Sequence, residues 1–385
     1  MVPIRYNLRS VLERRATSLM TILGVGMVAM IFVIVFGFIG GLQSTLLNAG
    51  GVQNWILLNR GAPQENASLI QRGQFDILRV RPEIAADSDG AALISPEILI
   101  GVNVSREKRF KQFVTLRGVM PIAYHVHRNT RLVSGRWPLR GNDEWVVGQK
   151  VAVRYPYLTP GAEFHYDRHD WKIVGIFSDN DSARESEIWT DNDDLRVEKH
   201  WELNADALHV VLKPGTGDAF TQALKQDGRL TIDPIPEADY YAAQSKIAAQ
   251  LQSLGMVVAL ALAIGATFGG MNTMYTAVAR REREIRVLRV LGFSRANILG
   301  SFVVESAILG IGGGIAGVIL SFIVAWMTGL NSRLMSVGTL FFSYRPNPEA
   351  ISAGLIAATI IGVLGGLLPA WRAARIGIID SIREA

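Results

Sequence analysis

The sequence predicts an α-helical membrane protein with four transmembrane helices and a large mixed α/β extracytoplasmic domain inserted between the first two. The 385-residue chain has a mean hydropathy of +0.23 and only 19% charged residues, which is too apolar for an ordinary soluble protein. Four apolar stretches each exceed the roughly 20 residues that cross ~30 Å of hydrocarbon. A long stretch of mixed polarity, residues 43–246, separates the first two.

Composition excludes several other classes of protein. The chain has no cysteine, so disulfides, thiolate metal sites and cysteine nucleophiles are excluded. Its net charge of +5 does not indicate a nucleic-acid partner, because the arginines gather beside the apolar stretches and not on one aqueous domain. The expected surroundings are membrane lipid.

Residues 1–15 predict a cytoplasmic amphipathic helix on the membrane surface. Ile4, Leu8, Val11 and Leu12 share one helical face, and Arg5 and Arg9 lie on another. The alternative is a simple cytoplasmic extension of the first span.

Residues 16–42 form the first predicted span, with no charge after Arg15. A signal peptide is the alternative, since arginines precede the stretch. The apolar core of a signal peptide is roughly 7–15 residues, and this stretch is nearly twice as long. An uncleaved anchor fits better.

Residues 43–246 predict the mixed α/β domain. "DAFTQALKQ" has the pattern of a helix, and "DYYAAQSKIAAQLQSLG" has helical spacing that would extend the second span outward as a stalk. The predicted strands are "WILLN", "FDILRV", "ALISPEILIGVNV", "FVTLRGV", "EWVVG", "WKIVGIF" and "ALHVVLK".

Three further spans are predicted over residues 247–279, 296–330 and 350–371. Residues 331–349 form a short outer loop, and residues 372–385 a cytoplasmic tail. Glu305 is the one ionisable residue inside a span. Such residues are often functional, but Glu305 lies near the inner interface, where we expect it to snorkel or to pair with an arginine.

The distribution of arginines predicts the orientation of the spans. The N-terminal segment, the loop at 280–295 and the tail are rich in arginine, whereas the loop at 331–349 holds only Arg333 and Arg345. Because basic residues stay on the cytoplasmic side, both termini are expected to be cytoplasmic and residues 43–246 to lie outside.

Small residues four apart predict close helix packing in the spans. Gly37 and Gly41 lie in the first span, and Gly265 and Gly269 in the second. Each span has at least one such pair, so packing within one subunit is as good an explanation as a dimer interface.

The segment 280–295 predicts a short two-faced helix between the second and third spans. Ile285, Val287, Leu288, Val290 and Leu291 fall on one broad side, and Glu282, Arg286 and Arg289 on a narrow opposite strip. Gly292 would end this helix and Ser294 would cap the next. A loop that merely orients the spans by its positive charge is the alternative.

The full pattern "REREIRVLRVLGFSRANI" resembles the coupling segment of FtsX-like permeases, the MacB, LolC/LolE and FtsX group of type VII ABC transporters. It departs from that pattern at Arg286, where glycine is usual, and at Phe293, where a small residue is usual. We also expect Glu282 to take part in coupling to the ATPase. The positions that match are Arg281, Glu284, Ile285, Leu288, Arg289, Leu291, Gly292 and Ser294.

A second match lies at the C-terminus, where "LLPAWRAARIGIIDSIRE" resembles the ending of the same family. Ile378 and Ser381 depart from its usual proline and alanine. A weaker match, "VTLRGVMPIAYHV…LVSGRWPLRGNDEWVVG", resembles the family's outer domain. The C-terminal positions that match are Pro369, Ala370, Arg372, Ala373, Ala374 and Arg375.

The resemblance implies a permease subunit in a bacterial inner membrane. It implies a second permease copy, identical or related, packed through the first two spans. It also implies a cytoplasmic ATPase whose motion the coupling helix transmits to the outer domain. A periplasmic adaptor and an outer-membrane channel are further partners in such systems. Lipoprotein, lipid, peptide and hydrophobic drug all stay open as cargo.

No phosphate loop of the form G-x-x-x-x-G-K-[ST] occurs in the chain. We therefore expect no enzymatic activity and no cofactor in this chain, with ATP and magnesium bound by a separate ATPase. One alternative is an FtsX-like mechanotransmitter, which regulates an extracytoplasmic partner and transports nothing. A membrane-anchored receptor without an ATPase is another, and the coupling pattern speaks against it.

The histidines predict no metal site, and no catalytic residue is expected. His165 and His169 are four apart, which would suit a metal on a helix, but they lie in an expected hairpin with its turn near Asp167 to Asp170. His125 and His127 would share a strand face, with nothing nearby to complete a site.

Overall fold

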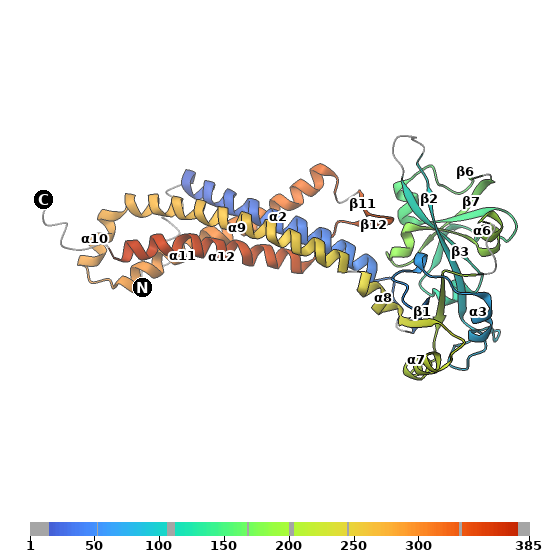
Figure 1. Ribbon diagram of the computed structural model, residues 1–385. Helices are drawn as coiled ribbons and strands as arrows, with labels where there is room; N and C mark the ends of the chain where they lie inside the picture. Colours follow the sequence, from blue (N-terminus) through green and yellow to red (C-terminus); the bar gives the residue numbers. More distant parts are fainter. Residues whose placement is uncertain are drawn as a thin grey trace. The chain divides into compact units, whose positions relative to one another are not determined.

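The computed structural model describes residues 15–51, 53–105, 112–167, 169–199, 204–244, 246–330 and 333–375. The amphipathic helix expected over residues 1–15 and most of the C-terminal tail lie outside these residues. The chain forms two compact units (Figure 1). The helical unit takes its described residues from Met1–Gly41, Ala249–Ser332 and Tyr344–Ala385, and the mixed domain from Leu42–Ala248 and Arg333–Ser343.

Four helices of the described chain are long and apolar enough to cross a membrane. They run side by side in Figure 1. Their bounds are α2 (Arg15–Leu47), α9 (Lys246–Arg280), α11 (Arg295–Thr328) and α12 (Pro348–Ala374). The predicted fold class, four spans with a mixed α/β domain between the first two, is confirmed.

Small residues bring α11 and α12 into close contact. A Cβ atom added to Gly362 would lie 2.6 Å from the Cα atom of Gly310, which is closer than real Cβ atoms approach other atoms. Gly317 meets Gly26 of α2 in the same way. These small residues therefore serve packing within one subunit.

The mixed domain is built on one large sheet with the strand order β10-β1-β9-β2-β3-β8-β5-β7-β4, and β6 pairs with β7 beside it. Neighbouring strands are antiparallel except β3 with β8 and β5 with β7. The strands are β1 (Asn54–Asn59), β2 (Ile94–Asn103), β3 (Phe113–Val119), β4 (Arg131–Gly135), β5 (Glu144–Gly148), β6 (Glu163–Tyr166), β7 (His169–Ser178), β8 (Glu187–Asp191), β9 (Ala207–Val211) and β10 (Ile232–Pro236).

Short helices connect and cover these strands. "DAFTQALKQ" forms α7, whose buried Phe220 and Leu224 lie one turn apart and face the sheet core. The helices of the domain are η1 (Glu65–Ala67), α3 (Arg72–Leu78), α4 (Ala123–Val126), α5 (Gln149–Arg154), η2 (Ala183–Ser186), α6 (Asn192–Lys199), α7 (Gly217–Gln226) and α8 (Glu237–Gln244).

The prediction of a strand at "FDILRV" is wrong, because most of this run belongs to helix α3. A capping box between Gln71 and Gln74 starts the helix immediately upstream. Phe75 and Leu78, three residues apart, then pack on the same core cluster. The apolar residues of "FDILRV" fit a strand pattern and a helical pattern equally well.

The stretch expected to extend the second span outward is helical on both sides of residue 245, which lies outside the described residues. Helix α8 reaches Gln244, and α9 starts at Lys246. Tyr240 and Tyr241 of α8 are buried in the mixed domain.

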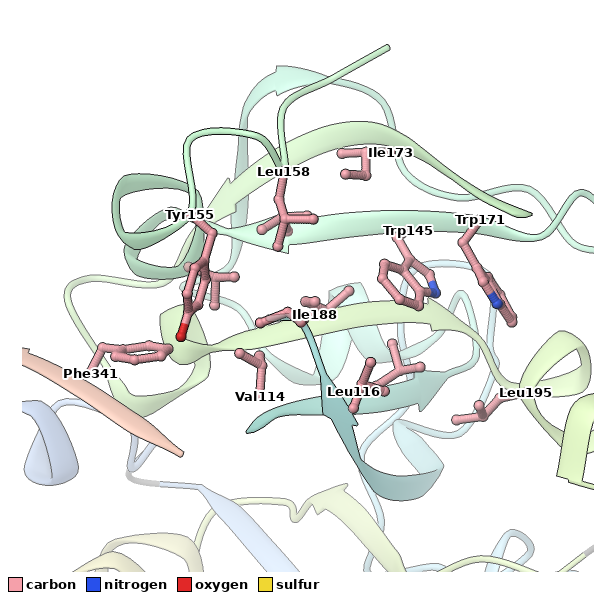
Figure 2. Close-up of a cluster of buried hydrophobic side chains, with 14 of the residues drawn as sticks. Val114, Leu116, Trp145, Tyr155, Leu158, Trp171, Ile173, Ile188, Leu195 and Phe341 are labelled. Atoms are coloured by element: carbon pink, nitrogen blue, oxygen red, sulfur yellow. The ribbon is translucent and has the colours of Figure 1, made fainter. Parts of the chain in front are cut away.

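Residues 331–349, predicted as a loop, contain a hairpin of β11 (Leu334–Val337) and β12 (Leu340–Ser343). The hairpin belongs to the mixed domain. The hydroxyl of Ser186 donates to the backbone oxygen of Phe341 (3.2 Å) and accepts from its backbone nitrogen (2.9 Å). The Phe341 ring meets Tyr155 edge-on in the core cluster drawn in Figure 2. Residues 333–343 of the predicted outer loop are thus part of the folded domain.

Candidate functional site

The segment between α9 and α11 forms the short helix α10 (Glu282–Val290). Arg281 precedes its first residue, and Gly292 after its end has φ of +93°, a left-handed conformation that glycine adopts without strain. The Ser294 hydroxyl then accepts from the Asn297 backbone nitrogen (3.2 Å) and starts α11. Both boundaries fall where the sequence pattern predicted them.

One residue fixes α10 to the spans. Ile285 is only 2% exposed and packs among side chains of three long helices. An apolar side chain of this size stabilises such a contact by about 1.5–3 kcal/mol. Its neighbours in the cluster are Met274, Ala277 and Val278 of α9, Ile298, Phe302 and Leu309 of α11, and Ala370 and Ala373 of α12.

An ion pair joins the start of α10 to the third span. Nη1 of Arg281 lies 3.2 Å from Oε2 of Glu305, whose side chain is buried. Arg281 also lies 3.6 Å from Glu284 on the next turn. The expectation that Glu305 pairs with an arginine near the inner interface agrees with this contact.

The remaining apolar side chains of α10 do not follow Ile285 inward. Leu288 is half-buried, whereas Val287, Val290 and Leu291 are exposed, Leu291 by 69%. The single broad apolar side seen on the helical wheel is therefore divided into a buried contact and an exposed surface. We call Val287, Val290 and Leu291 the outer apolar face of α10.

Charged groups hold the rest of α10 in place. Nη2 of Arg286 lies 2.7 Å from Glu282, the predicted pair four residues apart. Nη1 of Arg289 donates to the backbone oxygen of Phe293 (3.1 Å), beyond the end of the helix. The two residues that depart from the family pattern, Arg286 and Phe293, thus both take part in local contacts.

The C-terminal motif meets this segment. Pro369 and Ala370 are buried in α12, and Ala370 shares the cluster around Ile285. The guanidinium of Arg372 lies over the Tyr275 ring at 5.8 Å, and that of Arg375 over the Trp371 ring at 3.8 Å. Two motifs far apart in the sequence therefore form one structural site.

The glycines proposed for the dimer interface divide into two groups. A Cβ atom on Gly37 would lie 2.7 Å from the Tyr344 ring, so Gly37 packs inside its own subunit. Gly41 is also buried. Gly265 and Gly269 of α9 have no described atom within 4 Å of such a Cβ atom. Only the second pair faces open space.

The histidines lie in two kinds of surroundings. His165 and His169 occupy the predicted β6–β7 hairpin and pair separately, His165 with Asp170 at 2.7 Å and His169 with Asp143 at 3.3 Å. They do not converge on one point.

The expectation for His125 and His127 is wrong, since they belong to α4 and its C-terminal cap and not to a strand. His127 is buried, with Nε2 2.8 Å from Glu97, and His209 lies close by. The Arg117 guanidinium already lies between Glu97 and His209. Its Nη1 is 2.8 Å from Glu97 and 3.4 Å from His209. The arrangement suits an ion network better than a metal.

No pattern in the sequence predicts this network. Its members come from separate strands and turns, so no spacing joins them. The available signal was a single charge within an apolar strand, as at Glu97 in "SPEILI" and Arg117 in "VTLRGV".

Two protein families match most of the chain. Residues 17–227, more than half of it, match the MacB-like periplasmic core domain, and residues 256–378 match the FtsX-like permease C-terminal family. The chain belongs to the MacB-like and FtsX-like permeases of ABC transporters. The second match contains α10 and the C-terminal motif, the two elements that meet around Ile285.

Two relatives are similar over nearly the full length of the permease, and a third over about half of it. An uncharacterized ABC transporter permease of Methanocaldococcus jannaschii is 25% identical over 99% of this chain and 97% of its own. The permease YknZ of Bacillus subtilis, also uncharacterized, is 25% identical over 99% of this chain and 98% of its own. The macrolide export ATP-binding/permease protein MacB of Burkholderia cenocepacia is 26% identical over 54% of this chain, which covers 31% of that protein.

Proposed function

We propose that this permease is the membrane subunit of a MacB-like ABC transporter. ATP hydrolysis by a separate cytoplasmic ATPase would move its extracytoplasmic mixed domain and so export or extract a hydrophobic, lipidic or peptide cargo. The outer apolar face of α10 carries the proposal. Contiguous exposed apolar side chains on a charged helix mark an interaction surface, and we infer that a protein partner covers these three.

The contacts of α10 fit a transmitting element. Its inner side is fixed through Ile285 to three spans, and Arg281 ties its start to Glu305. A push on the outer apolar face would therefore reach α9, α11 and α12 together. A loop needed only for its positive charge requires neither the buried Ile285 nor the ion pair.

The active unit we propose contains two permease copies that meet through α9. This helix is the least covered of the four, with 6% of its most apolar window buried against 33–44% for the others. Gly265 and Gly269 lie on it beside open space. Small residues of this kind allow another helix to approach closely in lipid. Contact with lipid chains does not require small residues.

The decisive experiment places a charge on the outer apolar face. In tagged protein purified from its native membrane, Leu291→Asp should lower the amount of bound ATPase at least tenfold and abolish stimulated ATP hydrolysis, because the carboxylate would be desolvated without a partner. Leu139→Asp, at a leucine of similar exposure in the mixed domain, is the matched control. Equal ATPase binding by both variants would refute the proposal.

Transport itself needs a separate readout. Proteoliposomes containing permease and ATPase should accumulate or release cargo only with hydrolysable ATP. ATPase coupling without cargo movement would instead favour a mechanotransmitter.

A further inference from the structure

The mixed domain contains a pocket of about 320 Å3, which is at the small end of the range for small-molecule sites. Three buried residues, Glu65, Arg117 and Glu187, line the pocket, and we call them its deep wall. Tyr240 and Tyr241 of α8 form one side, and the turn between β11 and β12 forms another. All of these segments belong to the mixed domain.

A dense ion network lies behind the deep wall. Arg117 contacts Glu65 at 2.7 Å and Glu97 at 2.8 Å through Nη1, and it holds Glu187 with Nε and Nη2, both at 2.7 Å. His209 lies 3.3 Å from Glu65 and 3.4 Å from Glu97. Three carboxylates thus surround a single guanidinium.

The network continues away from the pocket. Arg184 contacts Asp179 at 3.2 Å and also pairs with Glu237. Glu237 in turn lies 3.6 Å from His209. The buried carboxylates of the whole network are Glu65, Glu97, Asp179, Glu187 and Glu237, and its arginines are Arg117 and Arg184.

The network contains more acidic than basic side chains. Burial by itself raises the pKa of Glu65, but Arg117 and His209 hold it well below its usual range. Burial lowers the pKa of His209, and the surrounding carboxylates, Glu97 first, raise it to about 9. Even with both imidazoles counted as charged, the five carboxylates outnumber the four basic side chains, which are Arg117, Arg184, His127 and His209.

Uncompensated negative charge in a buried network is unfavourable. The pocket is where a ligand can reach this network, through Glu65 and Glu187. Among the described residues, the contacts of the Glu65 carboxylate all involve Oε2. The carboxylate therefore retains an oxygen that can accept from a ligand.

The other walls fit an apolar group. Leu99, Ile100, Val337 and Leu340 line the pocket, and the Tyr240 and Tyr241 rings can face a cation. We propose that the pocket binds a small organic amine, with its ammonium group at Glu65 and Glu187 and its apolar body against these side chains.

Two segments around the pocket are neighbours of spans in the sequence. Helix α8 precedes α9 in the chain, and the β11–β12 turn lies between α11 and α12. An occupant of the pocket would contact both. Binding itself needs neither ATPase nor nucleotide, so the test stands apart from the proposed transporter function.

The experiment uses three probes of similar shape on the full-length protein in lipid nanodiscs: phenethylamine, 2-phenylethanol and phenylacetate. Titration calorimetry at pH 7 and low salt should show phenethylamine binding at least tenfold more tightly than 2-phenylethanol, and no binding of phenylacetate. Added salt should weaken the binding of the amine. Equal affinity for the amine and the alcohol would overturn the proposal.

Two variants locate the binding. Glu65→Gln removes the charge and should reduce affinity for the amine at least tenfold. Because this change also disturbs the buried network, Thr339→Trp is the second variant. It fills the pocket from the β11–β12 turn and leaves every carboxylate in place. Val80→Trp, at a highly exposed valine, is its control. If folded Thr339→Trp protein bound the amine as the control does, the pocket would not be the site.

Discussion

Nη1 of Arg281 lies 3.2 Å from Oε2 of Glu305, so the residue before α10 is paired with the one acidic side chain of α11. Both side chains are largely shielded, at 13% and 3% exposure. Because the pair has little access to water, the loss of one partner leaves the other charge poorly solvated. This contact and the packing of Ile285 together determine where α10 is held.

Glu305→Gln should therefore destabilise the helical unit by roughly 3 kcal/mol, since Arg281 keeps its charge and loses its buried partner, which the exposed Glu284 at 3.6 Å does not replace. The measurement is thermal unfolding of the purified protein in detergent, followed by circular dichroism. Glu349→Gln, at an exposed acid in the first turn of α12, is the matched substitution. If the unfolding midpoint of Glu349→Gln fell as far as that of Glu305→Gln, the Arg281–Glu305 pair would have no special role.

Gly269→Leu should weaken the proposed dimer without harming the subunit, because the added side chain enters open space beside α9. Gly37→Leu should instead destabilise the subunit, because it collides with Tyr344. The chain lacks cysteine, so single cysteines introduced along α9 can report the interface. Crosslinks between copies should form near Gly265 and Gly269 and disappear in Gly269→Leu. Their complete absence along α9 would rule out this interface.

Single cysteines also test the orientation. Val153 is exposed in the mixed domain, and Arg283 is exposed on α10. A membrane-impermeant maleimide should label Val153→Cys in cells with a permeabilised outer membrane, and Arg283→Cys only after lysis. The opposite result would invert the proposed topology.

The stability of the mixed domain should fall as the pH rises from about 7 to 9.5. His209 is ordinarily half-protonated at pH 6.5, and Glu97, Glu237 and Glu65 overcome the effect of burial to raise its pKa to about 9. A pKa raised in the folded state stabilises fully below the unfolded value, and this stabilisation is lost as the pH rises through the folded value. The loss should be on the order of a few kcal/mol.

The measurement is the unfolding midpoint at a series of pH values. His209→Gln should be less stable at pH 7 and should show a flatter curve between pH 7 and 9.5. His165→Gln, at an exposed hairpin histidine, should follow the original curve. An unchanged slope in His209→Gln would mean that other groups cause the pH dependence.

Phe341→Ala should destabilise the mixed domain by about 3–5 kcal/mol, because it leaves a cavity beside Tyr155. The variant should be cut by protease within the mixed domain at concentrations that the original protein resists. Phe113→Ala, at a half-exposed ring, should remain resistant. Equal resistance of both variants would show that the hairpin is not part of the domain core.

The spans and α10 could be predicted because their signals are local. Lipid requires long apolar runs, and Gly292 and Ser294 mark helix boundaries through their own backbone and side-chain chemistry. Helix α3 was missed because a short run such as "FDILRV" fits two periodicities, and the capping box that decides between them lies just upstream of it.

The partners of single residues could not be predicted, because they depend on tertiary contacts. Nothing local to Phe341 indicates Tyr155 or Ser186, which lie far away in the sequence. Gly37 and Gly269 have similar sequence surroundings, yet one packs against Tyr344 and the other faces open space. The Arg117 network has members on η1, β2, β3, β8 and β9, so only the folded sheet assembles it.

Because the β11–β12 hairpin is built into the mixed domain, the chain passes between the two units four times: near the end of α2, near the start of α9, after α11 and before α12. A domain on one linker can swivel about it, but each added covalent tether removes rotational freedom. The hairpin therefore limits the insertions and deletions that the sequence can tolerate, as well as the rotation of the mixed domain. Insertions at the surface loops of the sheet are free to vary in length, whereas a residue gained or lost in 331–349 would change one tether relative to the other three.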